Sequence, residues 1–311
     1  MPEEKKYPLI KSLGYRVEFA AVKILAGVAN LLSIEQASAM AAFFGKLAFL
    51  LLARKRKTAL ANLAIAFPEK TESERERIAQ KSFESAAISM TELFMFQKIV
   101  DSADERFDIS ETKYFDAGLA QNKGIILACS HLGAWECHEL ISNLKKTPLM
   151  VIVKNLKNPF VNKEINRLRA LSSVTPHDKD RAIRAVYTTV KNKGIAAILL
   201  DQWAGPDGIW IPFFGKETST TTIAVRFAQK TGGIIIPSFC VRVRPGRYKL
   251  ICLPELTVES ESREVEIELT RKLNILLEEK IREYPEQWIW GHRRWKDKPS
   301  RMRAQPNSEV F

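Results

Sequence analysis

Cysteine and histidine are both scarce in this 311-residue chain, which contains four of each. No two cysteines are spaced as Cys-x-x-Cys, and the metal-binding sequence His-Glu-x-x-His does not occur. These absences argue against a disulfide framework and against a zinc site. We therefore expect four reduced thiols in the core of a cytosol-facing protein, with no metal and no cofactor.

The standard motifs of serine hydrolases and nucleotide-binding proteins are also missing. No glycine is followed two positions later by serine, so the chain has no Gly-x-Ser-x-Gly nucleophile elbow. The dinucleotide-binding and P-loop glycine patterns do not occur either. Their absence weakens any interpretation that relies on a dinucleotide, a nucleoside triphosphate or a covalent serine intermediate.

Acidic residues are the minority among the charged ones: 36 Asp and Glu stand against 48 Lys and Arg, giving a net charge of +12. Hydrophobic residues make up 46% and charged residues 27%, which is the composition of a globular protein. The positive balance suits anionic partners, such as phospholipid headgroups, phosphorylated substrates, an acidic carrier protein or nucleic acid. Charge alone does not choose among them.

The amino end is rich in apolar residues, but no stretch of 18 residues in it is free of charge. Segment 19–53 is interrupted by Lys23, Glu35 and Lys46, and the first 60 residues contain ten basic and four acidic side chains. Three interpretations remain open: a single membrane span over about 17–34, two helices lying in the membrane interface, or a buried helical hairpin with solvated basic ends. Basic clusters that flank an apolar segment favour anionic lipid.

The rest of the chain predicts an α/β domain. A capping box, Thr71 with Glu74, begins a helical pattern over 71–100. Apolar runs without alternation then predict strands buried on both faces, and hence a mostly parallel sheet flanked by helices. The expected strands are 124–130, 148–154, 194–200, 233–243 and 248–253, the last two as a hairpin around a turn at 244–247; the expected connecting helices are 160–173, 178–192 and 220–230, and a final helix covers about 261–283. We place the domain at 61–300, after membrane-anchoring helices over 1–60 and before a loosely ordered tail, 301–311.

One histidine stands where open α/β sheets place their active sites. His131 directly follows the buried run 124–130, and Glu136 comes five residues later. On a regular helix these side chains would point about 140° apart, so they can hydrogen-bond only if His131 precedes the helix and Glu136 lies in its first turns. A carboxylate on one ring nitrogen would leave the other free to take a proton from a hydroxyl. The alternative is a purely structural histidine, either in the core or at a helix cap.

Several segments together resemble the bacterial lipid A late acyltransferases of the lauroyl and myristoyl type, within the wider glycerolipid acyltransferase group. The similarity runs from about residue 10 to 298. It is carried by ANLAIAFPE (61–69), the His-x-x-x-x-[Asp/Glu] block HLGAWE (131–136), INRLRALSS (165–173), LLDQWAG (199–205), WIPFFGKETSTTT (210–222) and PEQWIWGHRRWK (285–296).

This resemblance implies an O-acyltransferase at the cytoplasmic face of the inner membrane. The expected donor is a fatty acyl thioester of acyl carrier protein, and the expected acceptor is a hydroxyl of an anionic glycolipid, a lipid A precursor of the Kdo2-lipid IVA type. Because a thioester is already activated, a base acting on the hydroxyl suffices and no acyl-enzyme is needed. Acyl length, acylated position and oligomeric state stay open.

The resemblance also assigns roles to individual side chains. His131 is expected to be the general base, with Glu136 orienting it. Arg169 would contact the substrate phosphate or the developing oxyanion, with Arg167 as the close rival. Asp201 ends a buried run at the same sheet edge and is expected to line the site, the alternative being a helix cap; the sequence offers no second acid placed to complete a triad.

The carboxyl-terminal cluster His292, Arg293 and Arg294 could bind a phosphate or headgroup, or be a surface patch. Two rival functions also stay open. One is an acyltransferase for another glycolipid, such as a phosphatidylinositol mannoside, or one that uses acyl-CoA. The other is a membrane-tethered protein without turnover that binds anionic lipid or nucleic acid, although no nucleic-acid-binding motif occurs and we expect no nucleic-acid partner.

Overall fold

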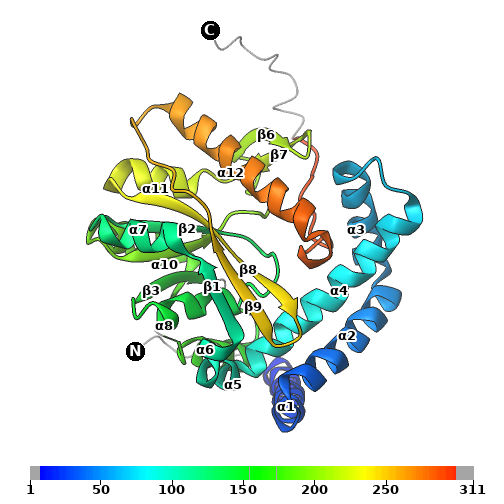
Figure 1. The fold of residues 1–311 in the computed structure, drawn as a ribbon. Coiled ribbons are helices and arrows are strands. Elements are labelled where there is room, and N and C mark those ends of the chain that lie inside the picture. The colour runs from blue at the N-terminus through cyan, green and yellow to red at the C-terminus, as the bar shows by residue number, and fades with distance from the viewer. Residues whose placement is uncertain (1–7, 154, 173, 299–311) are drawn as a thin grey trace.

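The computed structural model describes residues 8–153, 155–172 and 174–298. Its centre is a seven-stranded sheet in the order β1-β9-β8-β2-β5-β3-β4 (Figure 1). All neighbouring strands run parallel except β8 and β9, which form an antiparallel hairpin. The strands are β1 (Phe107–Glu111), β2 (Ile125–Cys129), β3 (Leu149–Val153), β4 (Val174–Asp178), β5 (Ile195–Leu199), β8 (Ile234–Arg244) and β9 (Arg247–Cys252). The expected mostly parallel α/β fold is confirmed.

Helices cover both faces of this sheet, because its central strands are buried on both sides. Along β2, Ile125, Leu127 and Cys129 pack into one apolar cluster, while Ile126 and Ala128 pack into another. Alternate side chains of a strand point to opposite faces, so each cluster belongs to one layer of helices. The layers contain α7 (Lys113–Ala120) and α8 (Ile141–Leu144) on one face, and α10 (Lys179–Lys191), α11 (Ile223–Thr231) and α12 (Arg263–Glu283) on the other.

The five strands expected from apolar runs are all present, but the sequence missed others. β1 exposes four of its five residues and lies at the sheet edge, so it lacks an apolar run. β4 follows α9 (Pro159–Arg169), and its sequence VTPHD is too polar to stand out. The separate hairpin of β6 (Ile209–Phe213) and β7 (Lys216–Thr220) was missed because β7, KETST, contains no apolar residue.

The amino-terminal region forms four helices: α1 (Leu9–Leu31), α2 (Ile34–Leu51), α3 (Ala53–Ala66) and α4 (Glu72–Phe94). α1 contains most of the segment 17–34 that was one candidate span, and it ends at Leu31, before Ser33 caps α2 in a capping box with Gln36. α2 is long and apolar enough to cross a membrane by length and composition, and a buried helix of a soluble protein passes the same test. The boundary expected at residue 60 falls inside α3, and the predicted tail 301–311 lies outside the described residues.

α4 is the expected capped helix, which begins after Thr71 and ends at Phe94; a short helix, α5 (Phe96–Asp101), continues the pattern. α2 packs closely along α4, and Gly45 permits this approach. A Cβ atom at Gly45 would lie 2.5 Å from the Glu84 Cα, which is closer than packed atoms come. The two helix backbones therefore touch at a residue that has no side chain.

We expect Gly45→Ala to destabilise the protein by roughly 1–3 kcal/mol, because the added methyl group forces α2 away from α4. Thermal unfolding followed by circular dichroism measures this loss. Gly27→Ala is the matched control: Gly27 lies in α1, and a Cβ atom added there would have no other atom within 4 Å, so alanine should leave the melting temperature unchanged or raise it slightly. Equal melting temperatures for the Gly45 variant and the unsubstituted protein would contradict the close packing.

Candidate active site

His131 and Asp201 meet at the carboxyl edge of the sheet. β2 and β5 are parallel neighbours in which Cys129 pairs with Leu199. His131 and Asp201, each two residues after its member of this pair, therefore emerge side by side. His131 Nδ1 lies 2.8 Å from Asp201 Oδ1, and the His131 backbone N–H donates to Asp201 Oδ2 over 3.0 Å. A carboxylate only accepts hydrogen bonds, so Nδ1 carries the proton and Nε2 is the unprotonated nitrogen of the neutral ring.

A third donor completes the environment of the Asp201 carboxylate. The indole N–H of Trp288 donates to Oδ2 over 2.8 Å, and the Asp201 side chain is only 1% exposed. Burial by itself raises the pKa of Asp201, but the charge of His131 and the three hydrogen bonds lower it to about 2. Asp201 is therefore ionised at every physiological pH.

The same kinds of effect act on the pKa of His131 in the opposite directions. Burial alone would lower its pKa, but the Asp201 charge, the hydrogen bond to it and the charge of Glu136 raise the pKa above its ordinary value. The His131 side chain is 18% exposed, so the ring is reached from solvent on one side. The Gln202 amide nitrogen lies 3.5 Å from Nε2, and the Trp135 ring stands 5.8 Å away.

The loop that carries His131 is fixed by backbone contacts around Gly133. This glycine has a positive φ of 68°, and a Cβ there would lie 2.2 Å from the Cys240 carbonyl oxygen. Its N–H donates to the Gln287 carbonyl over 3.0 Å, and its own carbonyl accepts from the Ser89 hydroxyl over 2.9 Å. Only glycine fits this position, because the conformation is left-handed and the neighbouring strand is in contact.

The predicted contact between Glu136 and His131 is wrong. Segment 132–133 forms bridges to Trp288 and Cys240, and the short helix η1 (Cys137–Leu140) begins only after Glu136, so His131 and Glu136 do not share one helix. The Glu136 carboxylate instead accepts from Arg169 at both oxygens, over 2.8 Å and 3.1 Å. Glu136 acts on His131 through its charge alone, and Asp201 takes the orienting position that the sequence analysis gave to Glu136.

The structure separates the two arginines that the sequence could not. Arg169, the last residue of α9, reaches the active-site loop through Glu136, and its side chain is 16% exposed. Arg167 lies on the outer side of the same helix, 57% exposed, and pairs with Glu164 over 2.9 Å. The hydrogen bond from Arg167 is the largest of the effects that lower the pKa of Glu164 to about 2. Arg169 is thus the one that belongs to the site.

The carboxyl-terminal basic cluster does not form one patch. The Arg294 side chain is fully buried and donates to Thr218 Oγ1, the Ser219 carbonyl and Thr220 Oγ1 of β7. The predicted substrate contact of Arg294 is therefore wrong; this guanidinium holds the polar strand β7 in the protein. Arg293 is exposed.

His292 and Trp288 are the parts of this terminal block that face the active site. His292 Nε2 accepts from the Trp203 N–H over 3.2 Å, and burial lowers the pKa of His292 to about 4, so the ring is neutral. Trp288 is the functional residue that sequence reasoning missed. It stands inside the block PEQWIWGHRRWK, but the apolar pattern there gave no sign that its N–H reaches Asp201.

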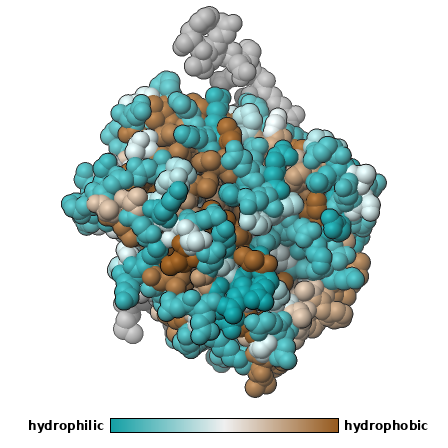
Figure 2. All heavy atoms as spheres, in the orientation of Figure 1, coloured by the Kyte–Doolittle hydropathy of each residue, from teal (hydrophilic) through white to brown (hydrophobic). Residues whose placement is uncertain are grey.

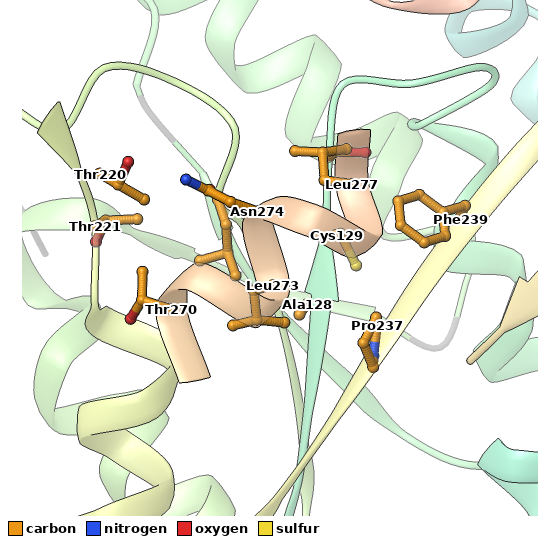
Figure 3. A pocket seen from close by; sticks show the side chains of 12 residues that line it. Ala128, Cys129, Thr220, Thr221, Pro237, Phe239, Thr270, Leu273, Asn274 and Leu277 are labelled. Carbon is orange, nitrogen blue, oxygen red and sulfur yellow. The ribbon is translucent and has the colours of Figure 1, made fainter. Parts of the chain in front are cut away.

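A small, mainly apolar cavity that Ser130 helps to line lies beside the site (Figure 3). β2, β8 and α12 line it with Ala128, Pro237, Leu273 and other side chains, and its volume is about 20 Å³. A cavity of that size holds about one water molecule. The Ser130 hydroxyl is buried and has no hydrogen-bond partner among the described residues.

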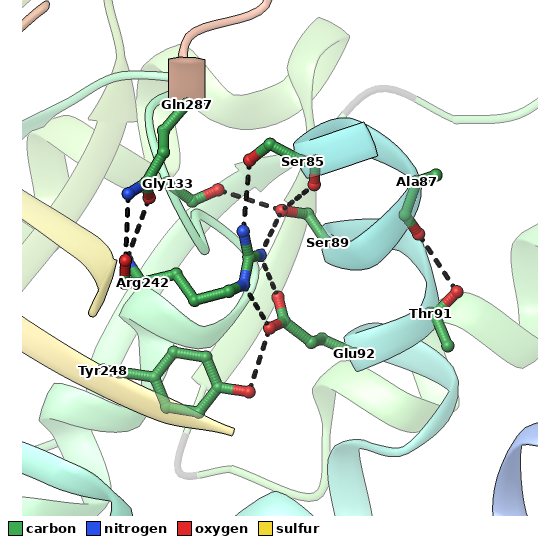
Figure 4. A network of polar contacts seen from close by, with 9 residues as sticks. All are labelled: Ser85, Ala87, Ser89, Thr91, Glu92, Gly133, Arg242, Tyr248 and Gln287. Atoms are coloured by element: carbon green, nitrogen blue, oxygen red, sulfur yellow. Dashed lines mark hydrogen bonds and ion pairs between the residues drawn. The ribbon is translucent and has the colours of Figure 1, made fainter. Parts of the chain in front are cut away.

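A buried ion pair braces the active-site loop from the side of α4 (Figure 4). Arg242 of β8 donates to both oxygens of Glu92 over 2.7 Å and 2.6 Å, and the side chains are 6% and 2% exposed. Arg242 also donates to Ser89, whose hydroxyl holds the Gly133 carbonyl, and the Gln287 amide bonds the Arg242 backbone in both directions. The pair therefore connects α4 with the Gly133 loop, which carries His131, and with the segment around Gln287, which precedes the Asp201 partner Trp288.

We expect Arg242→Met to destabilise the protein by about 3–5 kcal/mol, because it leaves the Glu92 charge buried without a partner. Chemical unfolding measures the change. The double variant Glu92→Gln/Arg242→Met should recover part of the loss, and Lys280→Ala, which breaks the surface pair with Glu283, should cost less than about 1 kcal/mol. A single variant no less stable than the double variant would contradict the buried-charge interpretation.

The site as a whole is that of an α/β enzyme able to deprotonate a hydroxyl. A buried, ionised carboxylate fixes the tautomer of a partly exposed histidine, and the second ring nitrogen, next to the Gln202 amide, is left unprotonated. Within the described residues, no cluster of three or more His, Cys, Asp or Glu is placed to hold a metal ion, and all four cysteines are buried and unpaired.

Comparison with known proteins identifies the family. Residues 3–297 match the model of the family described as bacterial lipid A biosynthesis acyltransferase. The chain therefore belongs to this family and is an acyltransferase. It is 28% identical to the lipid A biosynthesis lauroyltransferase of Escherichia coli strain K12 over 82% of this chain and 83% of the relative.

Two further similarities were found. The lipid A biosynthesis palmitoleoyltransferase of the same strain is 24% identical over 82% of this chain and 83% of the relative. The crystal structure of the 1-acyl-sn-glycerophosphate acyltransferase PlsC from Thermotoga maritima aligns with 81% of this chain and 99% of its own, with 15% identity and a TM-score of 0.39.

Proposed function

We propose that this acyltransferase moves a fatty acyl chain from an acyl carrier protein thioester to a hydroxyl of a lipid A precursor of the Kdo2-lipid IVA type. His131 is the general base in this proposal. The observation that carries it is the hydrogen bond between His131 Nδ1 and the buried Asp201, which leaves Nε2 free to accept a proton. The relatives, which are named for lipid A acylation, support the acceptor class.

The proposed reaction needs only one proton carrier. Nε2 of His131 takes the proton of the acceptor hydroxyl as its oxygen attacks the thioester carbonyl, which forms a tetrahedral oxyanion. The intermediate collapses, the carbon–sulfur bond breaks, and the imidazolium returns the proton to the departing thiolate. Asp201, whose pKa is about 2, stays ionised and stabilises the imidazolium formed between these steps. The acyl group is never attached to the protein.

Arg169 is proposed to face the acceptor. Its Nε and Nη2 donate to Glu136, and within the described chain no partner occupies Nη1. Glu136 thus fixes the guanidinium plane and leaves a charged donor for a phosphate or for the oxyanion. The side chains of Arg167 and Arg293 are exposed, so contact with an extended glycolipid stays a prediction for both.

We expect His131→Ala and Asp201→Asn each to lower kcat by roughly 10³-fold or more, since the first removes the base and the second removes its orienting charge. The assay uses the purified protein, lauroyl-acyl carrier protein and a tetra-acylated lipid A precursor, and mass spectrometry detects one added acyl chain. Activity should fall with decreasing pH as His131 takes up a proton, and the acidic limb of any residual kcat/KM of Asp201→Asn should move to lower pH, because Asp201 raises the His131 pKa.

Near-full activity of His131→Ala would rule out the base assignment. Two other outcomes identify the rival activities. Transfer to a phosphatidylinositol mannoside, but not to the lipid A precursor, would identify another acceptor, and transfer from acyl-CoA alone would identify another donor. Glu136→Gln serves as a comparison, because it removes the charge beside Arg169 and keeps the His131–Asp201 hydrogen bond.

The helices α1 and α2 are proposed to lie in the cytoplasmic interface of the inner membrane rather than to span it. Large apolar side chains are exposed along both helices, among them Ile24 and Leu31 of α1 and Phe43 and Leu51 of α2. Figure 2 shows hydrophobic residues along the lower and right-hand edges of the molecule, where Figure 1 places these helices. Exposed apolar surface next to basic residues such as Arg54 is typical of helices bound at an anionic interface.

We expect Phe43→Ser/Leu51→Ser to weaken binding to vesicles that contain anionic phospholipid by roughly tenfold or more, because each side chain loses about 1.5–3 kcal/mol of apolar burial in lipid. Vesicle flotation measures the binding. Ile275→Ser is the matched control: Ile275 is 54% exposed on α12, away from these helices, and its loss should leave vesicle binding unchanged. Equal binding by the double variant would show that this face does not enter the membrane.

A further inference from the structure

A second and larger hollow lies between α10 and α11. This groove has a volume of about 600 Å³, and the loop after β5 contributes Ala204 and Gly208 to its lining. Ile183, Arg184 and Tyr187 line it from α10, and Arg226 and Lys230 line it from α11. The proton transfer described above uses none of these side chains.

The charge of the groove is mainly positive. Arg184 and Arg226 are both exposed, and neither has an acidic partner among the described residues. Lys230 forms an ion pair with Glu261, and Asp207 is an acidic member of the lining. The two arginines therefore present charge that is available to an anionic partner.

Apolar side chains stand between these cations. Ile183 is 66% exposed and Tyr187 is 41% exposed, and both lie on the same helix as Arg184. A surface that mixes exposed apolar groups with arginine is typical of protein interfaces. An acidic helix with one apolar face would match it, since its carboxylates would reach the arginines while its apolar side chains cover Ile183 and Tyr187.

One end of the groove lies near the catalytic edge of the sheet. α10 precedes β5 and α11 precedes β8, and each helix runs against the parallel strand that follows it, so the amino ends of both helices lie at the edge where His131 and Asp201 emerge. Ala204 comes three residues after Asp201, and Thr221 lines both the groove and the small cavity that Ser130 also lines. α10 and α11 lie on the side of the sheet away from α2 and α3 (Figure 1).

We propose that this groove is the docking surface for the acidic carrier protein that delivers the acyl thioester. This inference rests on the proposed function, because that function supplies the carrier. The positive charge matches an acidic partner, and the position lets a soluble donor approach the catalytic edge from a flank that α1 and α2 do not occupy. A lipid acceptor would instead arrive from the side of those two helices.

The test reverses the two unpaired charges with Arg184→Glu/Arg226→Glu. Isothermal titration with lauroyl-acyl carrier protein should show at least a tenfold weaker Kd, because attraction becomes repulsion at both positions. KM for the carrier should rise by a similar factor, with kcat nearly unchanged. Transfer from lauroyl-pantetheine, a thioester without the carrier protein, should proceed at the unsubstituted protein's rate. Lys191→Glu/Lys272→Glu is the control, since it makes the same charge change at exposed positions outside the groove.

The titration is independent of turnover, so it separates failure of this inference from failure of the proposed function. An unchanged Kd for the carrier in the arginine variant would overturn the docking surface even if acyl transfer is observed. A higher KM for the lipid acceptor, with the carrier Kd unchanged, would overturn it too and would assign the groove to the acceptor. A Kd weakened equally by the control variant would show a general charge effect and no specific surface. Absence of transfer from any thioester, with carrier binding intact and arginine-dependent, would count against the proposed function alone.

Discussion

The buried carboxylate of Asp201 is the constraint on which the rest of the site depends. An ionised group taken out of water must be compensated by partners, and Asp201 receives three donors from two separate parts of the chain. Its partners are the backbone and ring of His131 after β2, and the indole of Trp288 near the carboxyl end. Folding the terminal block against the sheet is therefore a condition for a correctly oriented histidine, and not a separate structural event.

The same rule organises the surroundings. Arg242 compensates Glu92 near the Gly133 loop, Arg169 compensates Glu136, and Arg294 donates from both terminal nitrogens to hydroxyl and carbonyl groups of β7. Each buried arginine holds an element that cannot be held by apolar packing alone, because the element carries a charge or a polar strand. Arg242 and Arg294 are thus buried structural charges, whereas the partly exposed Arg169 and the exposed arginines remain available to anionic partners.

The surface divides in a corresponding way. The apolar side chains exposed on α1 and α2 lie on one side of the sheet, and the cationic groove between α10 and α11 lies on another. Both regions lead to the carboxyl edge that carries His131. An enzyme that joins a lipid-borne acceptor to a water-soluble donor needs two such approaches, and in the proposed function the two surfaces serve these two substrates.

Local pattern was enough to predict the mostly parallel α/β fold, the five apolar strands, the capped helix α4 and the position of His131 at a strand end. Burial on both faces and helix capping depend on residues that are close together in the sequence. Local pattern did not predict which residue is the hydrogen-bond partner of His131. Sequence spacing favoured Glu136, five residues away, yet the strand pairing of β2 with β5 brings Asp201 to the ring from 70 residues away. Likewise, the sequence grouped Arg293 with Arg294 as neighbours, while the packing of β7 buries one and exposes the other. Residue types and strand ends are local properties of the chain, whereas the choice of which carboxylate meets which cation is made by the register of the sheet.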